Sequence, residues 1–348
     1  MTAPTTLMAA ETREIGETLR RQLAGQAAVL ADLAGRLGAA PPPLVVTCAR
    51  GSSDHAASFG KYVIEPRLGV MVASHAPSTS SLFATRLRGL EGALFIAISQ
   101  SGRSPDILDS IRLAREAGAV TVALVNDETS PAAALADHVL PILAGPEKAV
   151  AATKSCAGAM LSLVSLTAAL MPQGAARAGL QAALAAAPDV LDAAAQADWS
   201  AGVAALASAT GLFTLGRGLT FGVAMEAALK LKETCNLHAE GFSSAEVRHG
   251  PMALVGPDFP VLAFPPADLS ATGMAPLLEE FAGRGGPVLV AGGSMPAGLA
   301  LPVPAPLHPL IDPVVQLTCF YRLAEQLSLA RGHNPDAPPY LAKVTRTA

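Results

Sequence analysis

The chain has 348 residues, enough for two domains of ordinary size, and its 51% of hydrophobic residues can fill large buried cores. A formal net charge of -4, the lack of a Lys and Arg cluster and an aromatic content of 4% argue against a nucleic-acid-binding protein. The four cysteines are far apart, the apolar runs are short and no signal-peptide pattern is found, so we expect no disulfide or zinc framework, no membrane span and a cytoplasmic protein.

Residues 8–36 predict a helical leader, because apolar residues recur there at helical spacing, and the prolines at 41–43 end it. Helices are then expected to alternate with strands that lack clean polar alternation, which is typical of a parallel sheet covered on both faces. These buried strands are expected at residues 44–48, 70–74, 94–99, 120–125 and 139–143.

The most informative stretch of this half is Ser99-Gln-Ser-Gly-Arg-Ser104, which follows an apolar strand and precedes a helical pattern. Its polar side chains, the free N–H groups of the first helical turn and the helix dipole together favour binding of an anion, most simply a phosphate. The stretch lacks the lysine of a nucleotide P-loop and the glycines of a dinucleotide fingerprint, so a small phosphorylated metabolite fits better than a nucleotide. The alternative is a serine-rich N-cap with only a structural role.

A second α/β unit is expected after an apolar helix within residues 148–170 and an alanine-rich helical bridge at 173–200. Thr47-Cys-Ala-Arg-Gly51 and Thr214-Leu-Gly-Arg-Gly218 both close a strand and open a helix, which indicates an internal duplication of one α/β domain. The strands of this unit are expected at 212–215, 261–264, 288–291 and 301–303, and its helices at 223–237 and 312–330.

Candidate acid–base groups lie in this second half. Glu226, Lys230 and Glu233 share one face of the expected helix, either as a solvated stripe or as functional groups at a turn where α/β sheets present ligands. His249 has the side chain best suited to proton transfer near neutral pH, although a lone histidine is more often structural. Lys343 lies in a polar, proline-rich tail, where a lysine is ordinarily solvated. No spacing of His and Cys residues indicates a metal site.

A series of short motifs, in a fixed order along residues 44–346, resembles the sugar isomerase (SIS) domain family. They are most similar to the isomerase half of glucosamine-6-phosphate synthase and to its stand-alone deaminase relatives. The motifs are Gly51-Ser52-Ser53, Ser99-Gln-Ser-Gly-Arg-Ser104, Val150-Ala-Ala-Thr-Lys154, Leu215-Gly-Arg-Gly218, Glu226 to Glu233, Glu246-Val-Arg-His-Gly-Pro251 and Leu341-Ala-Lys343.

The resemblance implies an α/β fold of two tandem SIS domains, each a flavodoxin-like parallel sheet sandwiched by helices. The implied domains are a helical leader at 1–36, a first SIS domain at 37–172, a helical linker at 173–200, a second SIS domain at 201–330 and a C-terminal active-site tail at 331–348.

The resemblance also implies a role for individual residues. Glu233 would move a proton between carbons 1 and 2, and Lys230 would assist near the developing charge. His249 would open the sugar ring in the site of the partner subunit of a homodimer, and Lys343 would lie near the carbonyl end of the sugar. The sugar phosphate would be held by Ser53, Ser99, Gln100, Ser101 and Ser104, and the sugar would be lined by Ser52 and by the backbone of Val150 and Ala342.

Two departures from the synthase pattern bear on the activity. The synthase begins with a glutaminase domain whose nucleophile is an N-terminal cysteine, whereas no cysteine precedes Cys48 here, so we expect no ammonia production from glutamine. Arg50 and Arg103 replace a cysteine and an acidic residue of that pattern, and we expect them to add phosphate contacts. The Ser-Gly-Arg-Ser-Pro-Asp stretch and the ending at 343–347 are more similar to the stand-alone deaminases.

We therefore expect an amino-sugar-phosphate deaminase/isomerase that converts glucosamine 6-phosphate and water to fructose 6-phosphate and ammonia, with no metal or cofactor. The same chemistry on galactosamine 6-phosphate or fructosamine 6-phosphate stays open, as does a non-catalytic sugar-phosphate sensor. The expected partners are a small phosphorylated amino sugar and a second copy of the chain, and neither nucleic acid nor a membrane.

Overall fold

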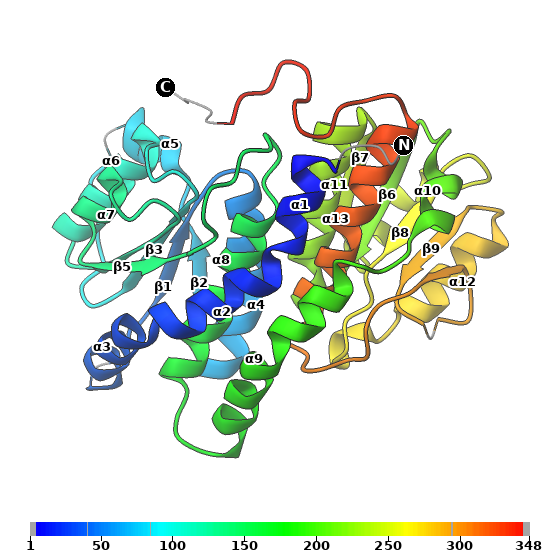
Figure 1. The fold of residues 1–348 in the computed structure, drawn as a ribbon. Helices are drawn as coiled ribbons and strands as arrows, with labels where there is room; N and C mark the ends of the chain where they lie inside the picture. Colours follow the sequence, from blue (N-terminus) through cyan, green and yellow to red (C-terminus); the bar gives the residue numbers. More distant parts are fainter. Residues whose placement is uncertain (1–4, 40, 84, 294, 344–348) are drawn as a thin grey trace. The chain divides into compact units, whose positions relative to one another are not determined.

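The structure is a computed structural model of the chain, and it describes residues 5–39, 41–83, 85–293 and 295–343 (Figure 1). The described residues divide into two compact units. The β1–β5 unit contains residues 17–146 and 154–185, and the β6–β10 unit contains residues 5–16, 147–153 and 186–343. The start of the expected leader and the 344–348 part of the expected tail, with most of the ending compared with the deaminases, lie outside the described residues.

The β1–β5 unit is built on a sheet of parallel strands in the order β2-β1-β3-β4-β5, which is the flavodoxin-like order (Figure 1). The strands are apolar because helices cover them: Phe95 and Ala123 pack with Ile107 and Ile111 of a helix in one buried cluster. The strands are β1 (Val45–Cys48), β2 (Val72–Ser74), β3 (Leu94–Ser99), β4 (Val120–Val125) and β5 (His138–Pro141). The helices are α2 (Ile15–Gly25), α3 (Ala27–Ala39), α4 (Ser52–Leu68), α5 (Pro77–Ser81), α6 (Pro105–Glu116), α7 (Pro131–Leu135), α8 (Lys154–Leu170) and α9 (Ala175–Ala194).

The β6–β10 unit repeats this topology. Its parallel strands lie in the order β10-β9-β8-β6-β7, which is the same order when the strands are counted from β6. The α/β fold class with two parallel sheets is therefore confirmed. The strands are β6 (Gly211–Gly216), β7 (His238–Ser243), β8 (Val261–Ala263), β9 (Val288–Ala291) and β10 (Leu299–Leu301). The helices are α1 (Leu7–Arg13), α10 (Ser200–Leu206), α11 (Phe221–Cys235), α12 (Met274–Gly283) and α13 (Asp312–Ala330), with short 3₁₀ helices η1 (Gly218–Thr220), η2 (Glu246–His249), η3 (Pro251–Leu254) and η4 (Leu269–Ala271).

Strand β7 is not among the strands expected from the sequence, which include none between the helix at 223–237 and the strand at 261–264. The strand pairs with β6 along one edge of the sheet, and Ala239 is its one fully buried side chain. A Cβ at Gly241 would lie 2.8 Å from Cα of Met225, so α11 packs directly on the strand at this glycine. Glycine is needed there for packing, and its presence hides the strand from a propensity argument.

Other boundaries differ for local reasons. The leader expected at 8–36 is three helices, because the chain leaves helical geometry near Glu14 and at Gln26. The amide of Gln26 is buried and donates to the carbonyl of Pro141 and to Ser162 Oγ, both 2.7–2.8 Å away. Strand β10 ends before Pro302 instead of covering 301–303, since proline cannot donate to a ladder. The domain limits at 36, 172, 200 and 330 stay predictions.

The four cysteines are buried and form no disulfide bond. Burial raises the pKa of the Cys48 and Cys319 thiols to about 12 and that of the Cys235 thiol to about 11. A thiol of such a pKa is protonated near neutral pH, so these residues offer no reactive thiolate. Within the described ranges, no helix is both long and apolar enough to cross a membrane.

Candidate active site

The predicted phosphate-binding residues gather at the carboxyl ends of two adjacent strands in the β1–β5 unit. Strands β1 and β3 are neighbours there, and the strand order reverses between them. Ligands of doubly wound sheets bind outside the carboxyl ends of the strands at such a reversal. Ser52 and Ser53 open helix α4 directly after β1, and Ser99 ends β3. The strand, turn and helix start predicted around Ser99 are confirmed.

The turn between β3 and α6 has its side chains arranged around one glycine. The hydroxyl of Ser99 accepts a hydrogen bond from the N–H of Gly102 at 3.1 Å, and Gly102 has a φ of 62°. A Cβ at this position would lie 2.2 Å from Ser130 Oγ, so a side chain does not fit. Gln100, Ser101 and Ser104 lie in the same turn, and their side chains are partly exposed.

The helix that follows this turn tests the alternative of a purely structural N-cap. Ser104 is the N-cap residue of α6, but its side chain makes no capping hydrogen bond. Helix α4 begins after Gly51, whose φ is 55° and which has no side chain to cap the helix. Neither N-cap residue therefore caps its helix with a side chain, although in α6 the N–H of Ile107 bonds to Oδ1 of Asp106 at 2.9 Å. The first turn of α4 is thus the better place for an anion.

The two arginines expected to contact the phosphate are each paired with a carboxylate, and their phosphate contacts stay a prediction. Arg50 donates to Asp106 from Nε at 3.0 Å and from Nη2 at 2.8 Å, and Asp106 is 1% exposed. Arg103 pairs with Asp127 at 2.8 Å. The Arg50–Asp106 pair ties the turn after β1 to the first turn of α6, so it braces the two turns that carry the predicted phosphate ligands. Sequence reasoning missed Asp106, whose partner is separated from it by 56 residues.

The acid–base residues of the β6–β10 unit form a cluster on α11. Lys230 is fully buried, with its Nζ 3.3 Å from Glu226 Oε1 and in contact with the carboxylate of Glu233. Glu226 is also fully buried and accepts a hydrogen bond from the hydroxyl of Tyr321 on α13 at 3.3 Å. The interpretation of this helix face as a solvated stripe is wrong, because α13 covers it.

Glu233 differs from the rest of this cluster, because 23% of its side chain is exposed. The buried ammonium group of Lys230 lies between the two carboxylates, and the Glu233 carboxylate is the one that reaches the surface. The fixed lysine restricts the orientation of the Glu233 carboxylate, as a group that transfers a proton at a defined atom requires. Of these three residues, Glu233 is thus the one whose side chain is accessible to solvent.

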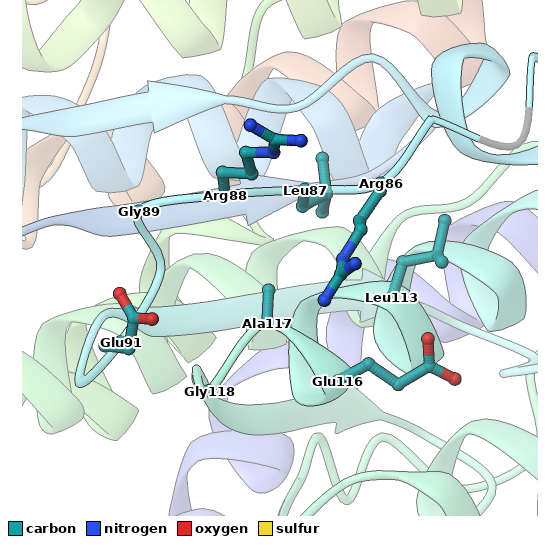
Figure 2. A pocket seen from close by; sticks show the side chains of 9 residues that line it. All are labelled: Arg86, Leu87, Arg88, Gly89, Glu91, Leu113, Glu116, Ala117 and Gly118. Carbon is teal, nitrogen blue, oxygen red and sulfur yellow. The ribbon is translucent and has the colours of Figure 1, made fainter.

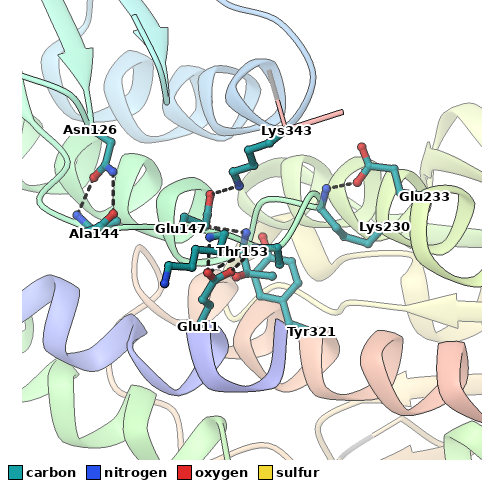
Figure 3. A network of polar contacts seen from close by, with 12 residues as sticks. Glu11, Asn126, Ala144, Glu147, Thr153, Lys230, Glu233, Tyr321 and Lys343 are labelled. Atoms are coloured by element: carbon teal, nitrogen blue, oxygen red, sulfur yellow. Dashed lines mark hydrogen bonds and ion pairs between the residues drawn. The ribbon is translucent and has the colours of Figure 1, made fainter. Parts of the chain in front are cut away.

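Lys343 and Val150 are brought together within the same unit. Nζ of Lys343 lies 2.8 Å from the carboxylate of Glu147, at the start of the loop that carries Val150 (Figure 3). The N–H of Val150 donates to the carbonyl of Asp336 at 3.1 Å, which leaves its carbonyl as the backbone group to offer a ligand. Ala342 is exposed beside Lys343.

His249 is exposed at the end of η2, and no contact with the Glu233 cluster is recorded among the described residues. Its predicted role in the site of a partner subunit stays a prediction. Ser52 is partly exposed, and its carbonyl accepts a hydrogen bond from Sγ of Cys156 at 3.4 Å. In the part of the chain that the structure describes, no group of three His, Cys, Asp or Glu residues is placed to hold a metal ion.

A cavity of about 770 Å³ lies elsewhere in the β1–β5 unit (Figure 2). It is lined by the segment before β3 and by the turn between α6 and β4, and so lies at the amino ends of these strands. Its charged lining residues are Arg86, Arg88, Glu91 and Glu116. None of the predicted site residues lines this cavity, which separates it from the edge that carries the serines.

Comparison with known proteins adds a family match. The sequence pattern of the SIS domain matches residues 43–170 and 205–291. The chain is 35% identical over 315 residues to glutamine–fructose-6-phosphate aminotransferase (isomerizing) of Zymomonas mobilis, an alignment that covers 86% of this chain and 51% of that protein. The chain thus spans about half the length of the curated relatives that it matches.

Solved structures show the same fold. A candidate phosphosugar isomerase from Silicibacter pomeroyi superposes with a TM-score of 0.90 at 42% identity, over 95% of this chain and 100% of that chain. Glucosamine-6-phosphate deaminase of Thermotoga maritima superposes with a TM-score of 0.78 at 22% identity, over 98% and 100% of the two chains. The second likeness is one of fold alone.

Proposed function

This chain belongs to the SIS domain family, and we propose that it is a phosphosugar isomerase whose reaction is the deamination of glucosamine 6-phosphate. The observation that carries the proposal is the cluster on α11, in which a fully buried lysine holds a partly exposed glutamate. Such a carboxylate suits proton transfer next to a carbonyl group. The relatives named above act on, or are named for, phosphorylated sugars, which supports the same substrate class.

The proposed reaction starts from the open-chain sugar, which has an aldehyde at carbon 1 and an amine at carbon 2. Glu233 removes the proton from carbon 2 while O1 takes up a proton, which gives an enolamine. Glu233 then returns its proton to carbon 1 as the nitrogen loses one, so that the net change moves one proton from carbon 2 to carbon 1 and one from nitrogen to O1. The product is a ketimine, and water adds to it to give fructose 6-phosphate and ammonia. His249 assists ring opening, and the ammonium group of Lys343 lies near the oxygen that gains negative charge during the proton transfer.

The phosphate is the proposed anchor of the substrate. Ser53 lies in the first turn of α4, and Ser99, Gln100, Ser101 and Ser104 lie in the turn that leads to α6. Hydroxyl groups and helix N-termini bind the phosphate group and do not discriminate between different sugars. The anchor is therefore proposed to fix the substrate by its phosphate group.

An assay of ammonia release from glucosamine 6-phosphate, with no glutamine present, tests the reaction. We expect ammonia and fructose 6-phosphate to appear in equal amounts, because each ketimine hydrolysed gives one of each. Galactosamine 6-phosphate and fructosamine 6-phosphate are assayed in parallel. Release from one of these alone would move the proposal to that substrate, and binding of all three without turnover would overturn it in favour of a sugar-phosphate sensor.

The proposed role of His249 requires a homodimer, and mixed subunits test it. The Glu233→Gln and His249→Ala variants are each expected to be nearly inactive. In a mixed dimer, the His249→Ala subunit keeps its own Glu233 and receives His249 from its neighbour, so one of the two sites is complete. Equal mixing after co-refolding should therefore restore about a quarter of wild-type activity, as expected for random pairing in a twofold dimer. No recovery in a mixture shown to contain mixed dimers would contradict this role.

A further inference from the structure

One buried carboxylate joins the loop 147–153 to the tail. The side chain of Glu147 is fully buried, and its two oxygens have different partners. Oε2 accepts from Nζ of Lys343 at 2.8 Å, and Oε1 accepts from the N–H of Thr153 at 3.0 Å (Figure 3). Glu147 thus closes the loop on itself and also reaches a side chain that is separated from it by 196 residues.

Two further acidic residues brace the same loop. The carboxylate of Glu11, on α1, accepts hydrogen bonds from the N–H groups of Lys148 and Ala149. The carbonyl of Asp336 accepts from Val150, and its carboxylate accepts from the N–H groups of Leu7 and Met8, each at 2.8 Å, at the start of α1. The loop, α1 and the base of the tail therefore form one connected set of hydrogen bonds within the β6–β10 unit.

Residues 340–342, which precede Lys343 in the tail, have little packing of their own. Tyr340 and Leu341 are exposed, and so is Ala342. A lysine on such a segment has many accessible rotamers, so a fixed acceptor is needed to place its ammonium group. The carboxylate of Glu147 provides this acceptor in a buried position.

We propose that Glu147 is a positioning residue that sets the ammonium group of Lys343 against the loop that carries Val150. This inference rests on the proposed function, because Lys343 and Val150 matter to catalysis only if they line the sugar. Glu147 acts through Lys343, which it holds beside this loop, and does not touch the substrate.

The chemistry of the two partners explains why the residue is a glutamate. Both Lys343 Nζ and the Thr153 N–H are donors, so both oxygens must be acceptors. A glutamine offers one acceptor and one NH₂ group. Whichever way the amide is turned, its NH₂ group faces a donor, and one of the two contacts is lost.

The experiment compares Glu147→Gln, Lys343→Met and the double variant with the wild-type chain, with the exposed Lys232→Met and Glu279→Gln as matched controls. Misplacing a reacting group by about 1 Å can lower the rate about 10²-fold, so we expect losses of this order in kcat for both single variants, with smaller changes in KM. The double variant should lose no more than Lys343→Met alone, because Glu147 acts through Lys343. Losses that multiply in the double variant would overturn the proposal.

Amide hydrogen exchange supplies a readout that does not depend on turnover. Glu147→Gln should speed exchange at Thr153 or in residues 337–343, since one of the two contacts is lost, whereas the controls should not. Unchanged exchange in both places would overturn the proposal, even if the wild-type chain turned over no sugar phosphate. If Glu147→Gln does not fold, Lys343→Met decides instead: the tail should exchange faster while the Thr153 amide stays protected.

Discussion

The Glu233→Gln variant should lose turnover of the amino-sugar phosphate by about 10²–10⁴-fold in kcat, the range expected when a general base is removed. The amide has the shape of the carboxylate but cannot accept the proton from carbon 2. The Kd for the sugar phosphate should change by less than about twofold, because the lost interaction belongs to the chemical step and the proposed phosphate anchor lies on other elements. Steady-state kinetics and calorimetric binding of fructose 6-phosphate measure the two quantities.

The exposed Glu279 on α12 provides the matched control, because Glu279→Gln makes the same chemical change away from the cluster. This control should keep wild-type kcat and Kd. Wild-type turnover by Glu233→Gln would contradict the assignment of the base. A loss of binding equal to the loss of rate would instead assign Glu233 to substrate binding.

The largest effect on stability is expected from Lys230→Met. Lys230 is fully buried beside Glu226, which is equally buried, and beside the partly exposed Glu233. Removing the ammonium group leaves a carboxylate buried without its opposite charge, which typically costs about 3–5 kcal/mol of the free energy of unfolding. The midpoint of urea unfolding, followed by circular dichroism, should fall accordingly.

A second variant separates loss of charge balance from loss of packing. Replacing a whole buried ion pair by neutral groups of similar volume is often neutral, so Glu226→Gln combined with Lys230→Met should regain much of the lost stability. The exposed Lys232→Met on the same helix should stay within about 0.5 kcal/mol of the wild-type chain. A Lys230→Met variant as stable as the Lys232→Met control would show that the buried pair does not stabilise the fold.

The strands predicted best are those whose side chains are buried on both faces. The bounds of β3, β4, β9 and α13 agree with the sequence analysis, because continuous apolar runs and clear helical periodicity carry the pattern alone. Strand β7 carries no such run, since it lies at an edge and contacts α11 through Gly241. Its pairing is fixed by tertiary packing, which local sequence does not report.

In the candidate site too, local sequence predicts some features, whereas others depend on tertiary packing. Spacing correctly predicts that Glu226, Lys230 and Glu233 share a helix face, but it does not show that α13 covers this face. No sequence motif singles out Glu147, because its partner Lys343 is separated from it by 196 residues. Periodicity and short motifs thus locate the elements that carry a site, whereas the partners of buried charges need the folded structure.

Because the native cysteines are buried, a cysteine introduced into the tail can be labelled selectively for spectroscopy. Thiol-reactive dyes attack the thiolate, and the raised thiol pKa values of Cys48, Cys235 and Cys319 leave little of it at pH 7. A cysteine introduced at the exposed Tyr340 would react first, without removal of the native thiols. A fluorophore at this position would report the movement of the segment next to Lys343 in real time while ligands bind.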